Sequence, residues 1–272
     1  MKQPRKHLLC LLLALWLTGV LLAGCAADTA DANADLPVIT VGCDNYPPFT
    51  YVNSDGKPVG IDVELADEAF RRMGYRPEFV TINWAEKNAL LENGVIDCIW
   101  SSFSMSGRAD EYTWAGPYMY SHQVVAVMPD SDIQTLADLA GKTVVVQATT
   151  KPESLFLDGN DPRIPEIRAL HSLQKRELIY SYLSKGYADA VAAHETSILQ
   201  FMKDYGVEFR ILEEPLEAVE LGVAFSRSDD RGIAQALSAT LEEMQADGTT
   251  RSILASYLAD PDKYLEADGY AD

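Results

Sequence analysis

The chain has 272 residues, enough for one large domain or two compact lobes, and 47% of them are apolar and 23% charged, as in globular proteins. Its formal net charge is −19, and it reaches −22 without the first 24 residues, which hold three cations and no acid. This acidity argues against nucleic acid as a partner, because backbone phosphates require a basic surface, and it is explained most simply by solubility.

The first 24 residues predict a secretory signal. A basic start is followed by an apolar run over 8–20, which is shorter and nearer the N-terminus than a standard membrane-spanning helix. Leu22-Ala23-Gly24-Cys25 is similar to a bacterial lipobox, in which the cysteine becomes lipidated, for example with palmitate; the alternative is an ordinary signal with an incidental cysteine. We expect a lipid at Cys25, a flexible tether over 25–36, and a domain outside the bacterial cell membrane with no other membrane segment.

The first third of the chain alternates strand-like and helix-like segments. After the first strand, Pro47 and Pro48 prevent regular pairing. The first helix has acids early, Arg71-Arg72 late, and Gly74 as its stop. This alternation is typical of an α/β fold with a parallel sheet. The predicted elements are strands at 38–43, 77–81 and 95–100, helices at 61–73 and 84–91, and a turn segment at 51–60.

The stretch Ser101–Arg108 follows the third strand and holds four serines and an arginine. An arginine with hydroxyl and backbone N–H donors is suited to holding a carboxylate, although a polar loop with an ordinary surface charge is the simpler local interpretation. Asp44, Thr149-Thr150 and His194 also directly follow predicted strands. Because ligands of open α/β sheets bind at the carboxyl ends of strands, these positions favour a shared site.

A second α/β pattern begins after Trp114–Tyr118. Two such units joined by extended segments predict two lobes with a cleft between them. The predicted elements are strands at 123–128, 143–147, 164–170, 188–193 and 207–212, an extended segment at 219–225, and helices at 133–139, 174–184, 195–204, 229–246 and 249–258.

Four cysteines are present. Cys10 belongs to the signal, and Cys25 is the predicted lipid site. Cys43 and Cys98 each lie at the end of a strand-like run, and their spacing is not that of a zinc site. They are either two buried thiols or one disulfide formed in an oxidising compartment. We expect no metal and no cofactor.

A series of short motifs resembles the extracellular solute-binding proteins of bacterial polar amino-acid ABC importers, known as solute-binding family 3. Each motif is weak alone, but their order and spacing over 38–258 are jointly specific. The motifs are Asp44–Phe49, Gly60–Ala66, Gly94–Asp97, Arg108 with Pro117-Tyr118, Leu139–Val144 and Ala246–Thr249.

The resemblance implies an α/β clamshell of two lobes, each a mixed, mostly parallel sheet flanked by helices. The chain would cross between lobes near 120–124 and 216–222. A polar amino acid or related zwitterion would be bound in the cleft by hinge closure and passed to ABC permease subunits, with the protein acting as a monomer. The implied boundaries are 1–24 for the signal, 25–36 for the tether, 37–121 and 220–264 for lobe 1, 122–219 for lobe 2, and 265–272 for a tail.

The resemblance also assigns residues to the ligand's carboxylate. Arg108 corresponds to the arginine that pairs with the α-carboxylate. Ser102 and Ser104 correspond to first-lobe positions that contact the ligand's main-chain groups. Thr149 and Thr150 correspond to the second-lobe pair whose hydroxyl and backbone N–H hold the same carboxylate. A zwitterion loses water on entering a cleft, so both of its charges need such partners.

Other positions correspond to the side-chain end of the ligand. Asp44 matches an acidic position near the ligand side chain or, in some members, its ammonium. Tyr46 and Trp84 match positions that sandwich the side chain, although the residues alone also allow them to be core. Phe103, beside the serines, is a further candidate. Asp44 with the aromatic residues favours a polar or cationic ligand side chain.

The chain departs from the family pattern at the site of the ligand's ammonium. His194 stands where many members have an aspartate, and a neutral imidazole is a poor partner for an ammonium. Either Glu195, Asp44 or Glu220 takes that charge, or the ligand is not a standard α-amino acid; His194 could also be a helix cap. The loop from Ser104 to Arg108 is one residue shorter than the common form.

Two other functions stay open. Some relatives of this fold dehydrate prephenate-like or arogenate-like acids, which requires a positioned acid or base, and His194 with Glu195 is the candidate pair. The third possibility is a ligand sensor that signals through a partner protein. Because no nucleophile motif, metal spacing or phosphate loop appears, we predict a binding protein and not an enzyme.

Overall fold

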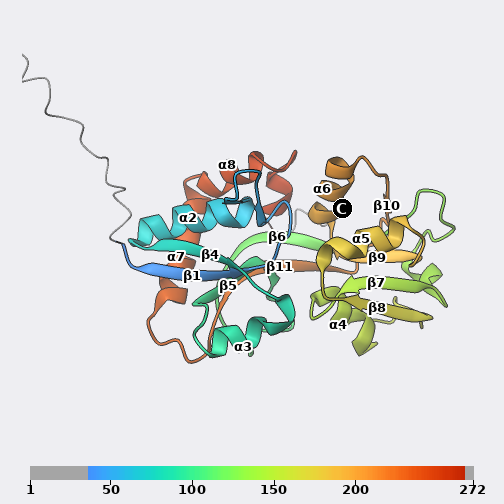
Figure 1. Cartoon of the computed structure of the whole chain (residues 1–272), viewed down its shortest axis with the longest axis horizontal. Helices are drawn as coiled ribbons and strands as arrows, with labels where there is room; N and C mark the ends of the chain where they lie inside the picture. The colour runs from blue at the N-terminus through green and yellow to red at the C-terminus, as the bar shows by residue number, and fades with distance from the viewer. Residues whose placement is uncertain (1–35, 267–272) are drawn as a thin grey trace, which may run out of the picture. The chain divides into compact units, whose positions relative to one another are not determined.

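The computed structural model describes residues 36–266, which form a mixed sheet with helices packed against it (Figure 1). Within the described residues the sheet has nine strands, in the order β4-β1-β5-β11-β6-β9-β7-β8, with β10 paired to β6. The strands are β1 (Val38–Cys43), β4 (Arg76–Thr81), β5 (Cys98–Ser104), β6 (Thr113–Val127), β7 (Thr143–Gln147), β8 (Ala169–Leu173), β9 (Ala190–His194), β10 (Arg210–Ile211) and β11 (Glu217–Phe225), and a separate hairpin joins β2 (Tyr51–Val52) to β3 (Pro58–Val59).

The sheet confirms the predicted α/β two-lobed clamshell. Strands β4, β1 and β5 are parallel and lie on one side of the antiparallel pair β6–β11, which is the longest in the sheet. Strands β9, β7 and β8 are also parallel and lie on its other side. We refer to these two groups as the first-lobe and second-lobe strands. The lobe boundaries at 121–122 and 219–220 stay predictions.

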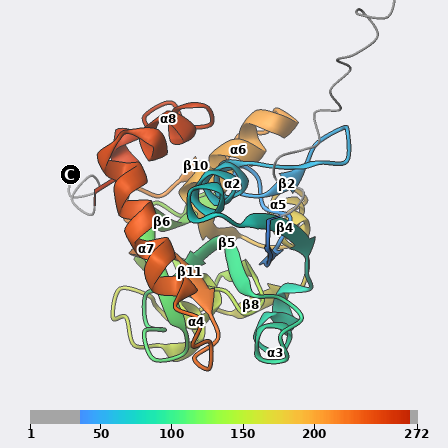
Figure 2. The ribbon, with the colours of Figure 1, turned by 90° about the vertical axis from the view of Figure 1, so that its left-hand side faces the viewer.

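Helices cover both faces of each strand group. In the first lobe, α2 and α7 pack on one face around Phe70, Trp100 and Leu237, and α3 covers the other (Figure 2). In the second lobe, Val145 faces α5 and α6, whereas Val144 faces the short turn 136–139. The helices are α2 (Ile61–Met73), α3 (Lys87–Glu92), α4 (Lys151–Asp158), α5 (Arg176–Ser184), α6 (Glu195–Tyr205), α7 (Ile233–Ala246) and α8 (Thr249–Ala255).

A Gly-x-x-Asp turn is used once in each lobe. Gly94 and Gly186 both have positive φ, of 66° and 70°, which a glycine adopts at no steric cost. Three residues later, Asp97 accepts from the Thr40 N–H at 2.8 Å, and Asp189 accepts from the Thr143 N–H at 2.6 Å. The two turns thus hold β1 and β7, which begin nearby, in the same way.

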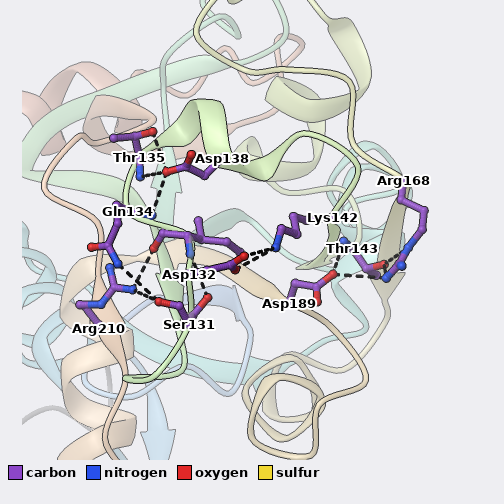
Figure 3. A network of polar contacts seen from close by, with 11 residues as sticks. Ser131, Asp132, Gln134, Thr135, Asp138, Lys142, Thr143, Arg168, Asp189 and Arg210 are labelled. Carbon is purple, nitrogen blue, oxygen red and sulfur yellow. Dashed lines mark hydrogen bonds and ion pairs between the residues drawn. The ribbon is translucent and has the colours of Figure 1, made fainter.

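Figure 3 shows the contact between Asp189 and Thr143, to which Arg168 also binds, and the nearby pair of Lys142 and Asp132. These contacts lie at the amino end of β7, whereas the predicted site lies at its carboxyl end and is formed by other residues. The network stabilises the sheet and takes no part in the site.

Two element predictions in the first half of the chain are wrong. The third strand does not end at Trp100: β5 continues through Ser104, because Phe103 and Ser104 pair with β11 and their side chains are buried. The pattern also does not break at Trp114–Tyr118, which lies inside the 15-residue β6; a bulge in β11 between Leu221 and Val223 accommodates this segment.

The second half contains smaller errors. The strand predicted at 164–170 begins only at Ala169, the one at 207–212 shrinks to Arg210–Ile211, and the helix at 133–139 is only a short 3-10 turn. Helix α4 was not expected. Each error falls where a local apolar pattern is outweighed by tertiary pairing or by a nearby turn.

Cys43 and Cys98 are both buried free thiols. Of the two alternatives, the structure therefore has the pair of thiols and not the disulfide. Burial raises the pKa of the Cys43 thiol to about 12 and that of Cys98 well above its ordinary value, which keeps both protonated. Cys25 and Cys10 lie outside the described residues. Among residues 36–266, no helix has both the length and the apolarity needed to cross a membrane.

Candidate functional site

A cavity lies at the carboxyl ends of β5, β7 and β9. Seven of the ten predicted site residues line it, and Asp44, Tyr46 and Thr149 do not. The lining is Trp84, Ser101, Ser102, Phe103, Ser104, Arg108, Gln123, Gln147, Thr150, Lys151, Pro152, Arg176, Ile179, Ala192, Ala193 and His194.

Arg108 is held at the cavity by the loop after β5. Its Nη1 donates to the Ser104 carbonyl at 3.2 Å, its guanidinium carbon lies 5.3 Å from the Phe103 ring centre, and its own carbonyl accepts from Trp114 Nε1 at 3.0 Å. Burial lowers the pKa of Arg108, which nevertheless remains a cation. The remaining donors of the guanidinium have no hydrogen-bond partner among the described residues. Arg108 is therefore a fixed, partly desolvated cation whose remaining N–H donors are available to a ligand.

Ser102 has an unusual backbone that a buried acid stabilises. Its φ is +45°, in the left-handed region that side-chain-bearing residues rarely adopt. The Ser102 N–H donates to Asp62 Oδ2 at 2.6 Å, and Tyr118 Oη donates to Asp62 Oδ1 at 2.9 Å. Burial raises the pKa of the Asp62 carboxyl to about 7, while these two hydrogen bonds act in the opposite direction. Asp62, in the first turn of α2, thus positions the serine segment without touching the cavity.

Several buried polar atoms around the cavity have no partner within residues 36–266. A buried polar atom without a partner is costly, and its native partner is often a bound water or ligand. Both acceptors and donors are represented, so the cavity presents groups for a ligand that carries both. These atoms are Ser102 Oγ, Ser104 Oγ, Gln123 Oε1, Gln147 Oε1 and Trp84 Nε1.

Asp44 does not present its carboxylate to the cavity. Its Oδ2 accepts from Gln147 Nε2 at 2.7 Å and from Arg176 Nε at 3.3 Å, and its Oδ1 accepts from the backbone N–H of Asn45 at 2.9 Å. Gln147 and Arg176 are second-lobe residues in the predicted division. Asp44 is therefore engaged in contacts between the lobes, where Arg176 neutralises it.

Tyr46 supports the same arginine. The Arg176 guanidinium carbon lies 3.3 Å from the centre of the Tyr46 ring, which is a close stacking contact. Tyr46 is buried, and its Oη accepts from the His194 N–H at 3.3 Å. Tyr46 is thus a packing residue behind the cavity wall.

The aromatic residues Trp84 and Phe103 form one apolar wall, with their ring centres 5.2 Å apart. Lys87 lies behind them, 5.0 Å from the Trp84 ring centre, and donates to Thr149 Oγ1 at 3.1 Å. Burial and then Arg108 lower the pKa of Lys87 to about 8. Thr149 is exposed and its hydroxyl is engaged by Lys87, whereas Thr150 lines the cavity at the start of α4.

His194 is a neutral member of a hydrogen-bonded chain. Gln123 Nε2 can only donate, so the His194 Nε2 at 2.9 Å accepts, and His194 Nδ1 then donates to Ser121 Oγ at 2.9 Å. Burial and the nearby Arg176 lower the pKa of His194 to about 3. This chain turns Gln123 so that its Oε1 has no partner among the described residues.

The suspected pair of His194 and Glu195 is not assembled. The Glu195 carboxylate binds Lys263 Nζ at 2.8 Å, and Glu195 does not line the cavity. Glu220 is exposed and also absent from the lining. None of the three acids considered for the ligand's ammonium therefore lines this cavity.

The low pKa of His194 gives a testable dependence of stability on pH. Between pH 6.5 and about 3 the unfolded state binds a proton that the folded state does not, so the free energy of unfolding falls as pH falls through this window. From pH 7.5 to 4.5 this loss is roughly 2 kcal/mol, and we expect His194→Gln to remove it. Urea denaturation of both proteins at the two pH values measures it; equal losses in both would contradict the assignment.

Residue patterns could have found two of the missed lining residues. Gln123 and Gln147 sit in otherwise apolar predicted strands, and a buried polar residue in such a strand is informative. Nothing in the sequence marks Arg176, the first residue of α5, as a site residue, because a cation at the start of a surface helix is common. Only the fold shows that the Arg176 side chain is buried. Lys151 was missed with α4 itself.

Comparisons with known proteins agree with this architecture. Residues 39–260 match the model of the bacterial extracellular solute-binding proteins, family 3. A putative amino-acid ABC transporter-binding protein, PatH, from Vibrio harveyi is 31% identical over 84% of this chain and 90% of its own length. The glutamate-binding protein GluB of Corynebacterium glutamicum is 27% identical over 92% and 90%. The crystal structure of Tv2483 bound to L-arginine has a TM-score of 0.75 and 26% identity over 82% of this chain and 91% of its own.

Proposed function

Because the chain belongs to family 3 of the bacterial extracellular solute-binding proteins, we propose that it binds a polar amino acid or related zwitterion in the cavity and delivers it to an ABC importer. The ligand is held by both lobes, which close around it by a hinge motion. Permease subunits recognise the closed form, and the protein acts as a monomer. The relatives are named as binding proteins, which favours this function over catalysis.

One observation carries this proposal: the cavity places a fixed arginine, Arg108, beside unpartnered buried acceptors. A free amino acid needs a cation for its carboxylate and acceptors for its ammonium, because burying either charge unpaired is very costly. Gln123 Oε1 and Gln147 Oε1 supply acceptors from the second lobe, and the Ser102 and Ser104 hydroxyls supply more from the first.

These contacts give each residue a role. Arg108 and the Thr150 backbone at the start of α4 hold the α-carboxylate. The two glutamine amide oxygens accept from the ammonium in place of the family's aspartate. Trp84 and Phe103 pack on the aliphatic carbons of the ligand. His194 acts indirectly, by orienting the Gln123 side chain through a hydrogen bond.

Isothermal titration calorimetry against all standard amino acids tests the proposal. The protein is purified in mild detergent and unfolded and refolded first, so that no co-purified ligand occupies the site. We expect at least one amino acid to bind with a dissociation constant near micromolar, or about −8 kcal/mol. No binding by any amino acid or close analogue would overturn it.

We also propose that Cys25 anchors the protein by lipid on the outer side of the bacterial cell membrane, as its lipobox-like context supports. Cys25→Ser is expected to abolish incorporation of labelled palmitate and to move the protein from the membrane fraction to the soluble one. Cys10→Ser, in the apolar run of the signal, is the matched control and should keep both properties. Membrane retention of the Cys25→Ser variant would contradict the anchor.

A further inference from the structure

We infer that the preferred ligand is an acidic amino acid, and that Arg176 binds its side-chain carboxylate. This inference rests on the proposed amino-acid-binding function and narrows it to one ligand class. From the sequence, Asp44 with the aromatic residues favoured a polar or cationic side chain, and the structure points to an anionic one.

Arg176 has the geometry of a preorganised carboxylate site. Its side chain is 7% exposed and lines the cavity. One face is stacked on Tyr46, and Nε is held by Asp44 at 3.3 Å, so the guanidinium plane is fixed from two directions. The two terminal nitrogens have no hydrogen-bond partner within residues 36–266. A guanidinium in this state offers its free edge to a carboxylate, which it binds with two parallel hydrogen bonds.

The charges around the cavity also favour an anion. The lining contains Arg108, Lys151 and Arg176, and none of the described lining residues is an aspartate or glutamate. Asp44 is paired with Arg176, and Glu217 is paired with Lys151 at 3.1 Å. Arg108 is left without a carboxylate partner, and Lys87 adds further positive charge behind Trp84.

Other acids lie near these cations without lining the cavity, and Glu177 and Asp204 line a neighbouring pocket together with Arg176. Glu111 interacts electrostatically with Arg108 and Lys87, and Glu153 accepts from the Thr149 N–H at 2.6 Å. Both lie outside the lining, as Asp44 and Glu217 do, so none of the four offers a carboxylate to a bound side chain. His194 is neutral and adds no negative charge.

A cationic ligand side chain finds no counter-charge here. Both oxygens of Asp44 already accept hydrogen bonds, and to reach a ligand Asp44 would have to release Arg176 inside the same site. A ligand with two carboxylates and one ammonium instead uses Arg108, Arg176 and the glutamine oxygens together. Its net negative charge matches the excess positive charge of the site.

Calorimetry with L-glutamate and L-aspartate, their amides L-glutamine and L-asparagine, and L-arginine, L-lysine and L-histidine tests the inference. We expect an acid to bind at least about tenfold more tightly than its amide, and the cationic ligands to bind weakest. Stronger binding of an amide or a cation would overturn the inference while leaving the proposed function intact. If none of these ligands and none of the other standard amino acids binds, the proposed function itself is overturned.

Variants assign the preference to Arg176. Arg176→Gln is expected to reduce the acid-to-amide ratio to near unity, and Arg176→Lys, which keeps the charge, to retain part of it. Arg168→Gln, an exposed arginine of the same lobe, should keep the wild-type ratio. Melting curves establish that each variant is folded.

Asp44→Asn supplies an independent readout if Arg176→Gln does not fold. The asparagine keeps a side-chain oxygen that can accept from Arg176 Nε, so the guanidinium stays in place while its charge is no longer neutralised, and the acid-to-amide ratio should stay the same or rise. A fall in this ratio, or an unchanged ratio in folded Arg176→Gln, would overturn the role of Arg176.

Discussion

Replacing Arg108 by alanine is expected to weaken binding of every amino acid ligand by at least about a hundredfold, or ~3 kcal/mol. The α-carboxylate would then enter a buried site without its cation, and the loss should be independent of the ligand's side chain. The free energy of unfolding of the empty protein should change little, because the only hydrogen bond that the Arg108 side chain makes within residues 36–266 goes to the Ser104 carbonyl.

Calorimetry measures the affinity, and urea denaturation without ligand measures the stability. Arg71→Ala is the matched control, since Arg71 is a 59% exposed cation on α2 that pairs with Glu68 and should affect neither quantity by more than about 0.5 kcal/mol. The affinity of Arg108→Lys should lie between those of the wild type and Arg108→Ala, because a lysine is a point charge that cannot form two parallel hydrogen bonds with a carboxylate. Retained binding in Arg108→Ala would place the carboxylate elsewhere.

Replacing Asp62 by alanine is expected to destabilise the protein by about 3 kcal/mol, although Asp62 touches no ligand. The change leaves two buried donors, the Ser102 N–H and the Tyr118 hydroxyl, without an acceptor, at about 1–3 kcal/mol each. Ligand affinity should fall as well, since the left-handed backbone at Ser102 loses the contact that stabilises it.

Urea denaturation and calorimetry test Asp62 with two companion variants. Tyr118→Phe removes one of the hydrogen bonds and should cost only about 1 kcal/mol, with little loss of affinity. Asp62→Asn keeps an acceptor for Ser102 and should retain more affinity than Asp62→Ala. A loss below about 1 kcal/mol in Asp62→Ala would show that the two donors find other partners.

The pH dependence separates Asp62 from His194. With its pKa raised to about 7, Asp62 binds a proton in the folded state that the unfolded state has lost, so stability falls as pH rises from about 4 to 7. His194 acts in the opposite direction over much of the same range. Asp62→Asn should therefore steepen the loss of stability on acidification, and His194→Gln should flatten it.

The family and the α/β fold class could be predicted from the sequence, because they depend on short motifs and on the local alternation of strands and helices. The first strand and helix were correct to the residue, since Gly74 ends α2 in a left-handed conformation and the acids and arginines fit its two ends. Of the residues that the sequence places after strands, Ser101–Ser104, Arg108, Thr150 and His194 line one cavity, because parallel strands bring their carboxyl ends to one edge.

What each polar residue does at that edge was decided only by the tertiary structure. By itself the sequence determined the fold class, the lobes' strand-helix alternation and the arginine beside the serines, since these follow from local patterns. Asp44 looked like a ligand contact and is instead paired with Arg176, 132 residues away. His194 looked like a possible base and is held neutral by burial. Charge and hydrogen-bonding capacity depend on partners distant in the chain, so only the folded molecule shows which groups remain available to a ligand.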